Sequence, residues 1–203
     1  MGNDGRVRID IAVFDGLDEL DALGPFEVLR GAAEAGADVV VRLVTRQPQD
    51  VVRAAHGLVF VPDAVYQPGA DILVVPGGGW VSRADVGAWG EVQRGDWLPV
   101  LAEARRTTAC LAAVCTGTMV LAHAGLVAGR RASTHRAALD DLRATGAVVV
   151  PERVVDDGDL VTCGGVTSGI DLALWLVERE LSAALADRIA ARMEYTRQRP
   201  SGA

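Results

Sequence analysis

One cysteine in this sequence stands where a thiol could do covalent chemistry. Residues 109–118 read ACLAAVCTGT, so Cys115 lies between an apolar run and Thr-Gly-Thr. A sharp strand-to-helix turn there would direct backbone N–H groups at the sulfur, and the helix dipole would favour its anion. Cys115 is then a candidate nucleophile with a pKa below the usual value of about 8.5. The alternative is a small buried hydrophobe, as most free cysteines are.

Two loops are expected to meet this cysteine. Residues 14–25 read FDGLDELDALGP, and residues 77–79 are three consecutive glycines after the apolar run ILVVP. In open parallel sheets, ligands bind at the carboxyl ends of the strands, where these loops and Cys115 should lie. Gly78 and Gly79 would offer backbone N–H donors to an oxyanion, because no side chain blocks the approach.

The elements that must position these loops alternate between strand and helix. This alternation predicts an α/β fold: a single-domain three-layer sandwich with a mostly parallel sheet and helices on both faces. An Asp-Gly turn is expected to join the last two strands. We expect strands at 7–14, 38–45, 58–63, 70–76, 107–114, 147–150, 153–158 and 159–163. We expect helices at 25–36, 116–125, 136–146, 167–180 and 182–198, and one or two within 80–106.

Composition narrows the function. The 203 residues are expected to form one domain with a core over about 6–195 and a C-terminal tail at 196–203. A net charge of −7 without a basic run disfavours nucleic acid and anionic membranes as partners. Three cysteines without ligand spacing disfavour disulfides and zinc, so we expect a cytoplasmic protein with no metal and no cofactor.

One uncharged segment has the length of a membrane span. Residues 107–129 carry no charge, and a span needs about 20 residues. The segment consists mostly of Ala, Gly and Thr, and the Cys-Thr-Gly turn divides it. We therefore interpret it as a buried strand followed by a buried helix.

Four stretches in the right order resemble one family. They are LDALGPFEVL, ILVVPGGG, VCTGTMVLAHAGLVAGRRASTH and CGGVTSGIDLALWLVE. Together they resemble the ThiJ/PfpI superfamily, which has a glutamine amidotransferase-like, flavodoxin-like fold. Within it, the chain is most similar to the isonitrile hydratase branch and to the sensor domains of AraC-type regulators.

The resemblance implies roles for individual residues. It places Cys115 at the nucleophile elbow and Asp21 at the acidic residue whose protonated carboxyl lies against the sulfur. Thr116 matches the residue after the cysteine, and the Gly78–Gly79 loop faces the elbow. His135 matches a histidine that many members place near the thiol. A carboxyl beside a thiolate in a desolvated pocket should have a raised pKa, so it stays protonated and donates.

Each of these residues also has a structural interpretation. Asp21 would merely cap the following helix if that helix began there. His135 is balanced between a site role and a structural one, and His56 and His123 are assigned structural roles. Asp18 and Glu19 are read as solvated loop charges, and Cys110 and Cys163 as packing residues.

Departures from the family patterns bear on activity. PfpI-type proteases follow the cysteine with histidine, whereas this chain has Thr116, and glutamine amidotransferases need a His-x-Glu that is missing after His135. Both activities therefore lose their base. Arg136 stands where the isonitrile hydratase branch usually has tryptophan, and LDALGP replaces its usual LDLTGP. The substrate can differ accordingly.

The resemblance implies a cysteine-dependent hydro-lyase that converts a small-molecule isonitrile to an N-substituted formamide, and a homodimer. Two alternatives stay open: a ligand- or redox-sensing domain without catalysis, and chemistry on glyoxal-type aldehydes. The last residues, YTRQRPSGA, leave no room for a helix-turn-helix, so direct DNA binding is not expected.

Overall fold

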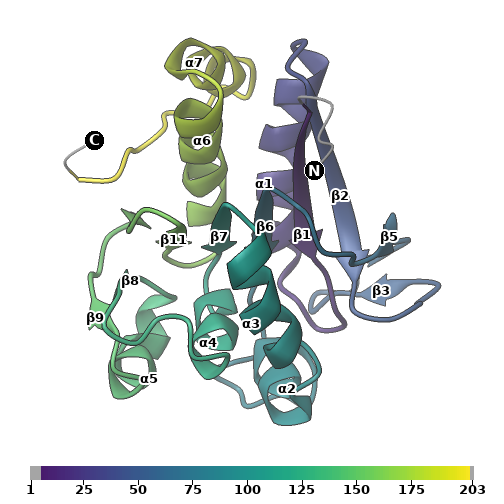
Figure 1. Cartoon of the computed structure of the whole chain (residues 1–203), viewed down its shortest axis with the longest axis vertical. Helices are drawn as coiled ribbons and strands as arrows, with labels where there is room; N and C mark the ends of the chain where they lie inside the picture. Colours follow the sequence, from purple (N-terminus) through teal and green to yellow (C-terminus); the bar gives the residue numbers. More distant parts are fainter. Residues whose placement is uncertain (1–5, 202–203) are drawn as a thin grey trace.

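A computed structural model describes residues 6–201, and a seven-stranded sheet lies at its centre (Figure 1). The strand order is β10-β11-β7-β6-β1-β2-β5, and every neighbouring pair is parallel except β10 with β11. The strands are β1 (Val7–Ala12), β2 (Val39–Thr45), β5 (Ala64–Val65), β6 (Ile72–Val75), β7 (Cys110–Ala113), β10 (Val154–Asp156) and β11 (Leu160–Cys163). The predicted α/β fold with a mostly parallel sheet is confirmed.

The helices form two groups, and helices of the same group pack against one another. One group, in the upper half of Figure 1, contains α1 (Glu19–Glu34), α6 (Ser168–Glu180) and α7 (Ala183–Arg192). The other, in the lower half, contains α2 (Gly87–Arg94), α3 (Leu98–Thr107), α4 (Gly117–His123) and α5 (Leu139–Ala144), with the 3-10 turn η1 (Arg136–Ala138) before α5. The segment at 107–129 is therefore β7 followed by α4, as predicted.

The central strands are apolar because helices cover both faces of the sheet. All four residues of β6, of β7 and of β11 are buried. The continuous apolar runs of β6 and β7 are typical of parallel strands that are buried on both sides. The carboxyl ends of β1, β6 and β7 lie on neighbouring strands, so the loops that follow them meet at one edge.

Helix α1 begins six residues earlier than predicted. Its N-cap is Asp18, whose side chain accepts the Leu20 N–H at 3.2 Å. Pro25 consequently lies inside the helix rather than in its first turn. The prediction was wrong because it took proline as a helix start, whereas the Asp18 cap sets the true one. A Cβ on Gly169 of α6 would lie 3.3 Å from Pro25 Cδ, so glycine permits the close packing of the two helices.

Two predicted strands do not join the main sheet. The segment at 58–63 contributes only β4 (Val59–Phe60), which pairs with β3 (Val52–Arg53) in a separate hairpin. The segment at 147–150 contributes β9 (Val148–Val149), which pairs with β8 (Arg131–Ala132). The edge strand β5, only two residues long, was missed because so short a run carries no recognisable pattern. The Asp157-Gly158 turn between β10 and β11 is as expected, with Gly158 at φ 83°.

The predicted C-terminal tail is attached to the domain as far as it is described. The Arg197 guanidinium is paired with Glu178 and Asp187, and the Gln198 N–H donates to Asp171 at 2.7 Å. Within residues 6–201, no helix is long and apolar enough to cross a membrane.

Candidate functional site: a thiol and a carboxyl at an elbow

Cys115 lies on a strained turn between β7 and α4. Its φ is 55°, a left-handed conformation that costs a non-glycine residue on the order of 1–3 kcal/mol. The side chain is 5% exposed. The turn requires glycine two residues later, because a Cβ on Gly117 would lie 2.0 Å from the Val75 carbonyl oxygen. The sequence prediction of a cysteine at a strand-to-helix elbow is confirmed.

Asp21, on the first turn of α1, presents a fully buried carboxyl to this thiol. The Gly77 N–H donates to Oδ2 at 3.0 Å, and Oδ1 has no hydrogen-bond partner among the described residues. Burial raises the pKa of Asp21 to about 8, and the charge of Asp18 adds to the rise, whereas the Gly77 N–H and the Cys115 thiol oppose it. The carboxyl is therefore mostly protonated at neutral pH, as predicted. Asp21 does not cap the helix, because Asp18 does.

The thiol itself departs from the sequence prediction. Burial raises the pKa of Cys115, and the nearby Asp21 carboxyl raises it further, while the backbone N–H groups of Val166 and Thr116 lower it. The prediction of a lowered pKa was wrong because lost hydration outweighs two N–H donors. Cys115 and Asp21 consequently titrate as a coupled pair, which holds both of its protons at neutral pH.

The triple glycine holds residues of the site in place, because two of its backbone N–H groups already donate hydrogen bonds to them. The Gly78 N–H donates to Thr116 Oγ1 at 2.9 Å, so it is already engaged and does not serve as the predicted free oxyanion donor. A Cβ on Gly77 would lie 2.5 Å from both the backbone nitrogen and Oγ1 of Thr116, so only glycine fits there. The Gly79 N–H has no partner among the described residues. The Thr116 hydroxyl accepts from Gly78 and keeps its own proton to donate.

Two residues near the sulfur were not predicted. The N–H of Val166 faces the thiol, and Val166 has φ 46°, a rare conformation for a β-branched residue. Thr134 donates its hydroxyl to the Cys115 carbonyl at 2.8 Å. Both lie in stretches that carry the family resemblance. The backbone conformation of Val166 and the hydrogen bond of Thr134 to a backbone carbonyl could not be predicted, because neither requires a recognisable pattern of residue types.

His135 lies beside the elbow, with no hydrogen bond to Cys115. Its Nδ1 accepts the Ala137 N–H at 3.2 Å, and its ring packs on Gly165, where a Cβ would lie 2.4 Å from Cδ2. A cavity of about 640 Å³ adjoins it, and Val166 belongs to the same cavity wall. His135 thus caps η1 and also lines the cavity, so both interpretations have support. His123 is structural, with Nδ1 at 2.8 Å from the Met119 carbonyl oxygen.

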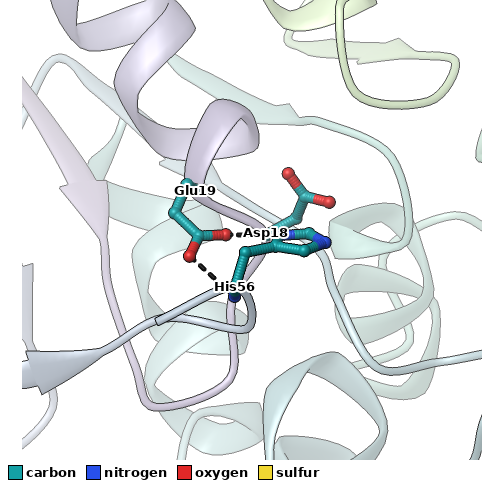
Figure 2. A group of neighbouring side chains, drawn as sticks. All are labelled: Asp18, Glu19 and His56. Atoms are coloured by element: carbon teal, nitrogen blue, oxygen red, sulfur yellow. Dashed lines mark hydrogen bonds and ion pairs between the residues drawn. The ribbon is translucent and has the colours of Figure 1, made fainter. Parts of the chain in front are cut away.

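A second polar cluster lies at the start of α1 (Figure 2). The Glu19 carboxylate accepts the His56 N–H at 2.7 Å and the Leu58 N–H at 3.3 Å, and it contacts His56 Nδ1 at 2.6 Å. The two acids read as solvated loop charges are thus an N-cap, Asp18, and an anchor for the β3–β4 hairpin, Glu19. The potential ligand atoms of Asp18, Glu19 and His56 lie within 4.8 Å of one another. The sequence spacing did not predict that these three residues meet, because His56 reaches the start of α1 only through the fold of the β3–β4 hairpin.

The chain is similar to known proteins over most of its length. The sequence pattern of the DJ-1/PfpI family matches residues 7–179. An isonitrile hydratase of Pseudomonas putida is 37% identical over 193 residues, which cover 93% of this chain and 78% of that protein. The transcriptional regulator CdhR of Pseudomonas aeruginosa is 33% identical over 178 residues, which cover 86% of this chain and 51% of the regulator.

Solved structures show the same fold. A ThiJ/PfpI family protein from Pseudomonas syringae superposes with a TM-score of 0.85 at 26% identity, covering 100% of this chain and 84% of that one. The oxidized DJ-1 of Toxoplasma gondii has a TM-score of 0.78 at 23% identity, covering 94% of this chain and 99% of that one.

Proposed function

Because the chain belongs to the DJ-1/PfpI family, we propose that it is a cysteine-dependent hydro-lyase, which adds water to an isonitrile and releases an N-substituted formamide. One observation carries the proposal: Asp21, buried and mostly protonated at neutral pH, faces the Cys115 thiol on a strained elbow. The pair brings a nucleophile and a proton donor together without a histidine base. The similarity to an isonitrile hydratase over most of the chain supports the choice of substrate.

In the first step, the thiol adds to the terminal carbon of the isonitrile. The S–C bond forms as Asp21 gives its proton to that carbon and takes the proton of the thiol. The product is a thioimidate, R–N=CH–S–Cys115, and Asp21 is again protonated. This exchange needs the two-proton form of the pair, which is the form that the raised pKa of Asp21 maintains at neutral pH.

In the second step, water resolves the thioimidate. The water oxygen bonds to the same carbon, one water proton passes to nitrogen, and the S–C bond then breaks. The second water proton returns to sulfur, so the formamide leaves and the thiol is restored. We propose that the Thr116 hydroxyl and the Gly79 N–H position substrate and water, because both retain a donor.

The test is turnover of a panel of alkyl and aryl isonitriles, followed by formamide appearance in mass spectrometry. Wild type should convert at least one isonitrile, and Cys115→Ser should convert none. Methylglyoxal is included in the panel, and turnover of that aldehyde alone would contradict the proposal.

A sensing role is the second candidate, because the chain is similar to about half of a transcriptional regulator. A sensor would bind a small molecule at the same cavity without consuming it. Saturable binding of an isonitrile by the wild type, with no formamide formed over hours, would favour sensing over catalysis.

A further inference from the structure

A cavity lies beside the elbow, and polar side chains form much of its wall. Its volume is about 640 Å³, and its wall includes Val166, whose N–H faces the sulfur, and Thr134, which is bonded to the Cys115 carbonyl. A substrate whose reacting carbon reaches Cys115 can therefore place its substituent in this cavity. The chemistry of the wall then decides which substituents fit.

The wall holds a cation without a counter-charge. Arg136 forms no ion pair and no hydrogen bond with any residue in the described range 6–201. The other guanidinium in the wall, Arg153, is paired with Asp171 and also bonds Tyr195 at 2.9 Å. The acidic residue of the wall, Glu152, accepts the Ser201 N–H at 3.4 Å and does not pair with Arg136. An anion in this cavity would find Arg136 available.

A hydroxyl of the cavity wall points to the same conclusion independently. Ser168 is 4% exposed and lines the cavity, yet its Oγ has no hydrogen-bond partner among the described residues. It is the first residue of α6, a helix of 13 residues whose N-terminal end favours negative charge. His135 adds a donor, because Nδ1 accepts the Ala137 N–H and the neutral ring then carries its proton on Nε2.

We propose that this cavity binds a carboxylate on the substrate, with Arg136 as the specificity-determining residue and Ser168 and His135 as further donors. A carboxylate matches the planar guanidinium in geometry, and its single charge suits a wall with one unpaired cation and one acidic residue. The preferred substrate is thus an isonitrile whose substituent carries a carboxylate. The reacting group in this statement rests on the proposed function, whereas the anion site rests on the wall residues alone.

Binding tests the anion site without any turnover. Titration calorimetry with benzoate, benzamide and inorganic phosphate is carried out on the full chain. Wild type should bind benzoate and not benzamide, and Arg136→Gln should weaken benzoate about tenfold. The matched control is Arg131→Gln, which removes an exposed arginine outside this wall that has no ion pair within residues 6–201, and it should change nothing. Equal binding of benzoate by wild type and Arg136→Gln would overturn the inference, as would phosphate binding more tightly than benzoate.

Turnover tests the substrate class. Isocyanoacetate and its methyl ester differ by one charge at the same distance from the isonitrile carbon. Wild type should show a higher kcat/KM for the acid, and Arg136→Gln should lose that preference through a higher KM for the acid, whereas Arg131→Gln should retain it. Benzoate binding without turnover of any isonitrile would refute the proposed function and leave the anion site standing. Turnover of acid and ester with equal kcat/KM by wild type would refute the substrate class.

Discussion

At the scale of single residues, the site is governed by desolvation. Asp21 is fully buried and Cys115 nearly so, and burial is the largest cause of the raised pKa of each. The two groups therefore keep their protons near neutral pH. A thiolate that persists at neutral pH would instead need a more polar or more exposed elbow.

The pH dependence of alkylation tests this pairing. The rate at which iodoacetamide modifies Cys115 should first rise as the pair loses one proton, around the Asp21 pKa of about 8. Asp21→Asn removes the titration near pH 8. In this variant the alkylation rate of Cys115 should rise only at higher pH, because burial still raises the pKa of the thiol. Peptide mass spectrometry separates Cys115 from the buried Cys110 and Cys163. Fast alkylation of wild-type Cys115 well below pH 7 would contradict the coupled pair.

Asp21→Asn should reduce turnover and increase stability. Asparagine keeps the size of the side chain but has no acidic proton, so turnover should fall by roughly 10²–10⁴-fold. The pKa of Asp21 is about 8 in the folded state, above its ordinary value of 3.8. Between these two pH values the folded state holds a proton that the unfolded state has lost, so stability falls as pH rises toward 8. Between pH 5 and 8, this group should lower the wild-type unfolding free energy by on the order of 2–4 kcal/mol.

Urea unfolding at both pH values measures that loss. The difference in unfolding free energy between pH 5 and pH 8 should be smaller in Asp21→Asn than in wild type. A matched control is Asp18→Asn, which keeps the N-cap and should unfold nearly like wild type at pH 5. Unchanged turnover in Asp21→Asn would show that the carboxyl is not the proton donor.

At the scale of elements, short loops hold the site together. The triple glycine after β6 contacts Asp21 through Gly77 and Thr116 through Gly78, so one loop positions residues from α1 and from the elbow. The β3–β4 hairpin is fastened to the start of α1 by Glu19, which receives two backbone N–H groups and the His56 ring. Helix start, glycine loop and hairpin thus depend on one another.

Glu19→Gln should release His56 and loosen the hairpin. The pKa of His56 is raised by the Glu19 hydrogen bond and by the charges of Glu19 and Asp18. In the variant it should fall toward its ordinary value of about 6.5, as a histidine NMR titration would show. A raised histidine pKa contributes stability at low pH that is lost as pH rises through the folded pKa, so wild-type protection of hairpin amides should fall there. An unshifted His56 would contradict the anchor.

At the scale of the whole molecule, the fold and the family are established and the assembly is a proposal. Residues 7–179 match the DJ-1/PfpI family, and a seven-stranded sheet carries the elbow at the carboxyl end of β7. The hairpin exposes adjacent apolar side chains, with Val61 72%, Val59 45% and Leu58 39% exposed. Exposed apolar side chains that gather on one segment favour a contact between chains.

We therefore expect a homodimer that uses this hairpin. Light scattering at micromolar concentration should give about twice the chain mass of 21.3 kDa. Val61→Asp should shift the population toward monomer, because a charge would be buried without a partner. Val148→Asp is the control, since Val148 is also exposed but lies on β9, outside the hairpin. A monomeric wild type over the whole range would contradict the expectation.

The sequence by itself determined the alternation of strands and helices and the place of the elbow. Apolar runs such as 70–76 and 107–114 predict buried parallel strands, because only helices on both faces make such runs stable. Gly117, two residues after Cys115, predicts the sharp turn, since glycine alone tolerates the close approach of β6. These features depend on residues that are close together in the sequence, so they can be predicted from the residue types alone.

Only the tertiary structure decided the proton affinities and the hydrogen-bond partners. The pKa of Cys115 is raised rather than lowered because its hydration is removed by segments distant in sequence. The Gly78 N–H is engaged by Thr116, 38 residues away, and Glu19 meets His56 across 37 residues. Desolvation and long-range contacts depend on how elements pack, and no local pattern of residues encodes them.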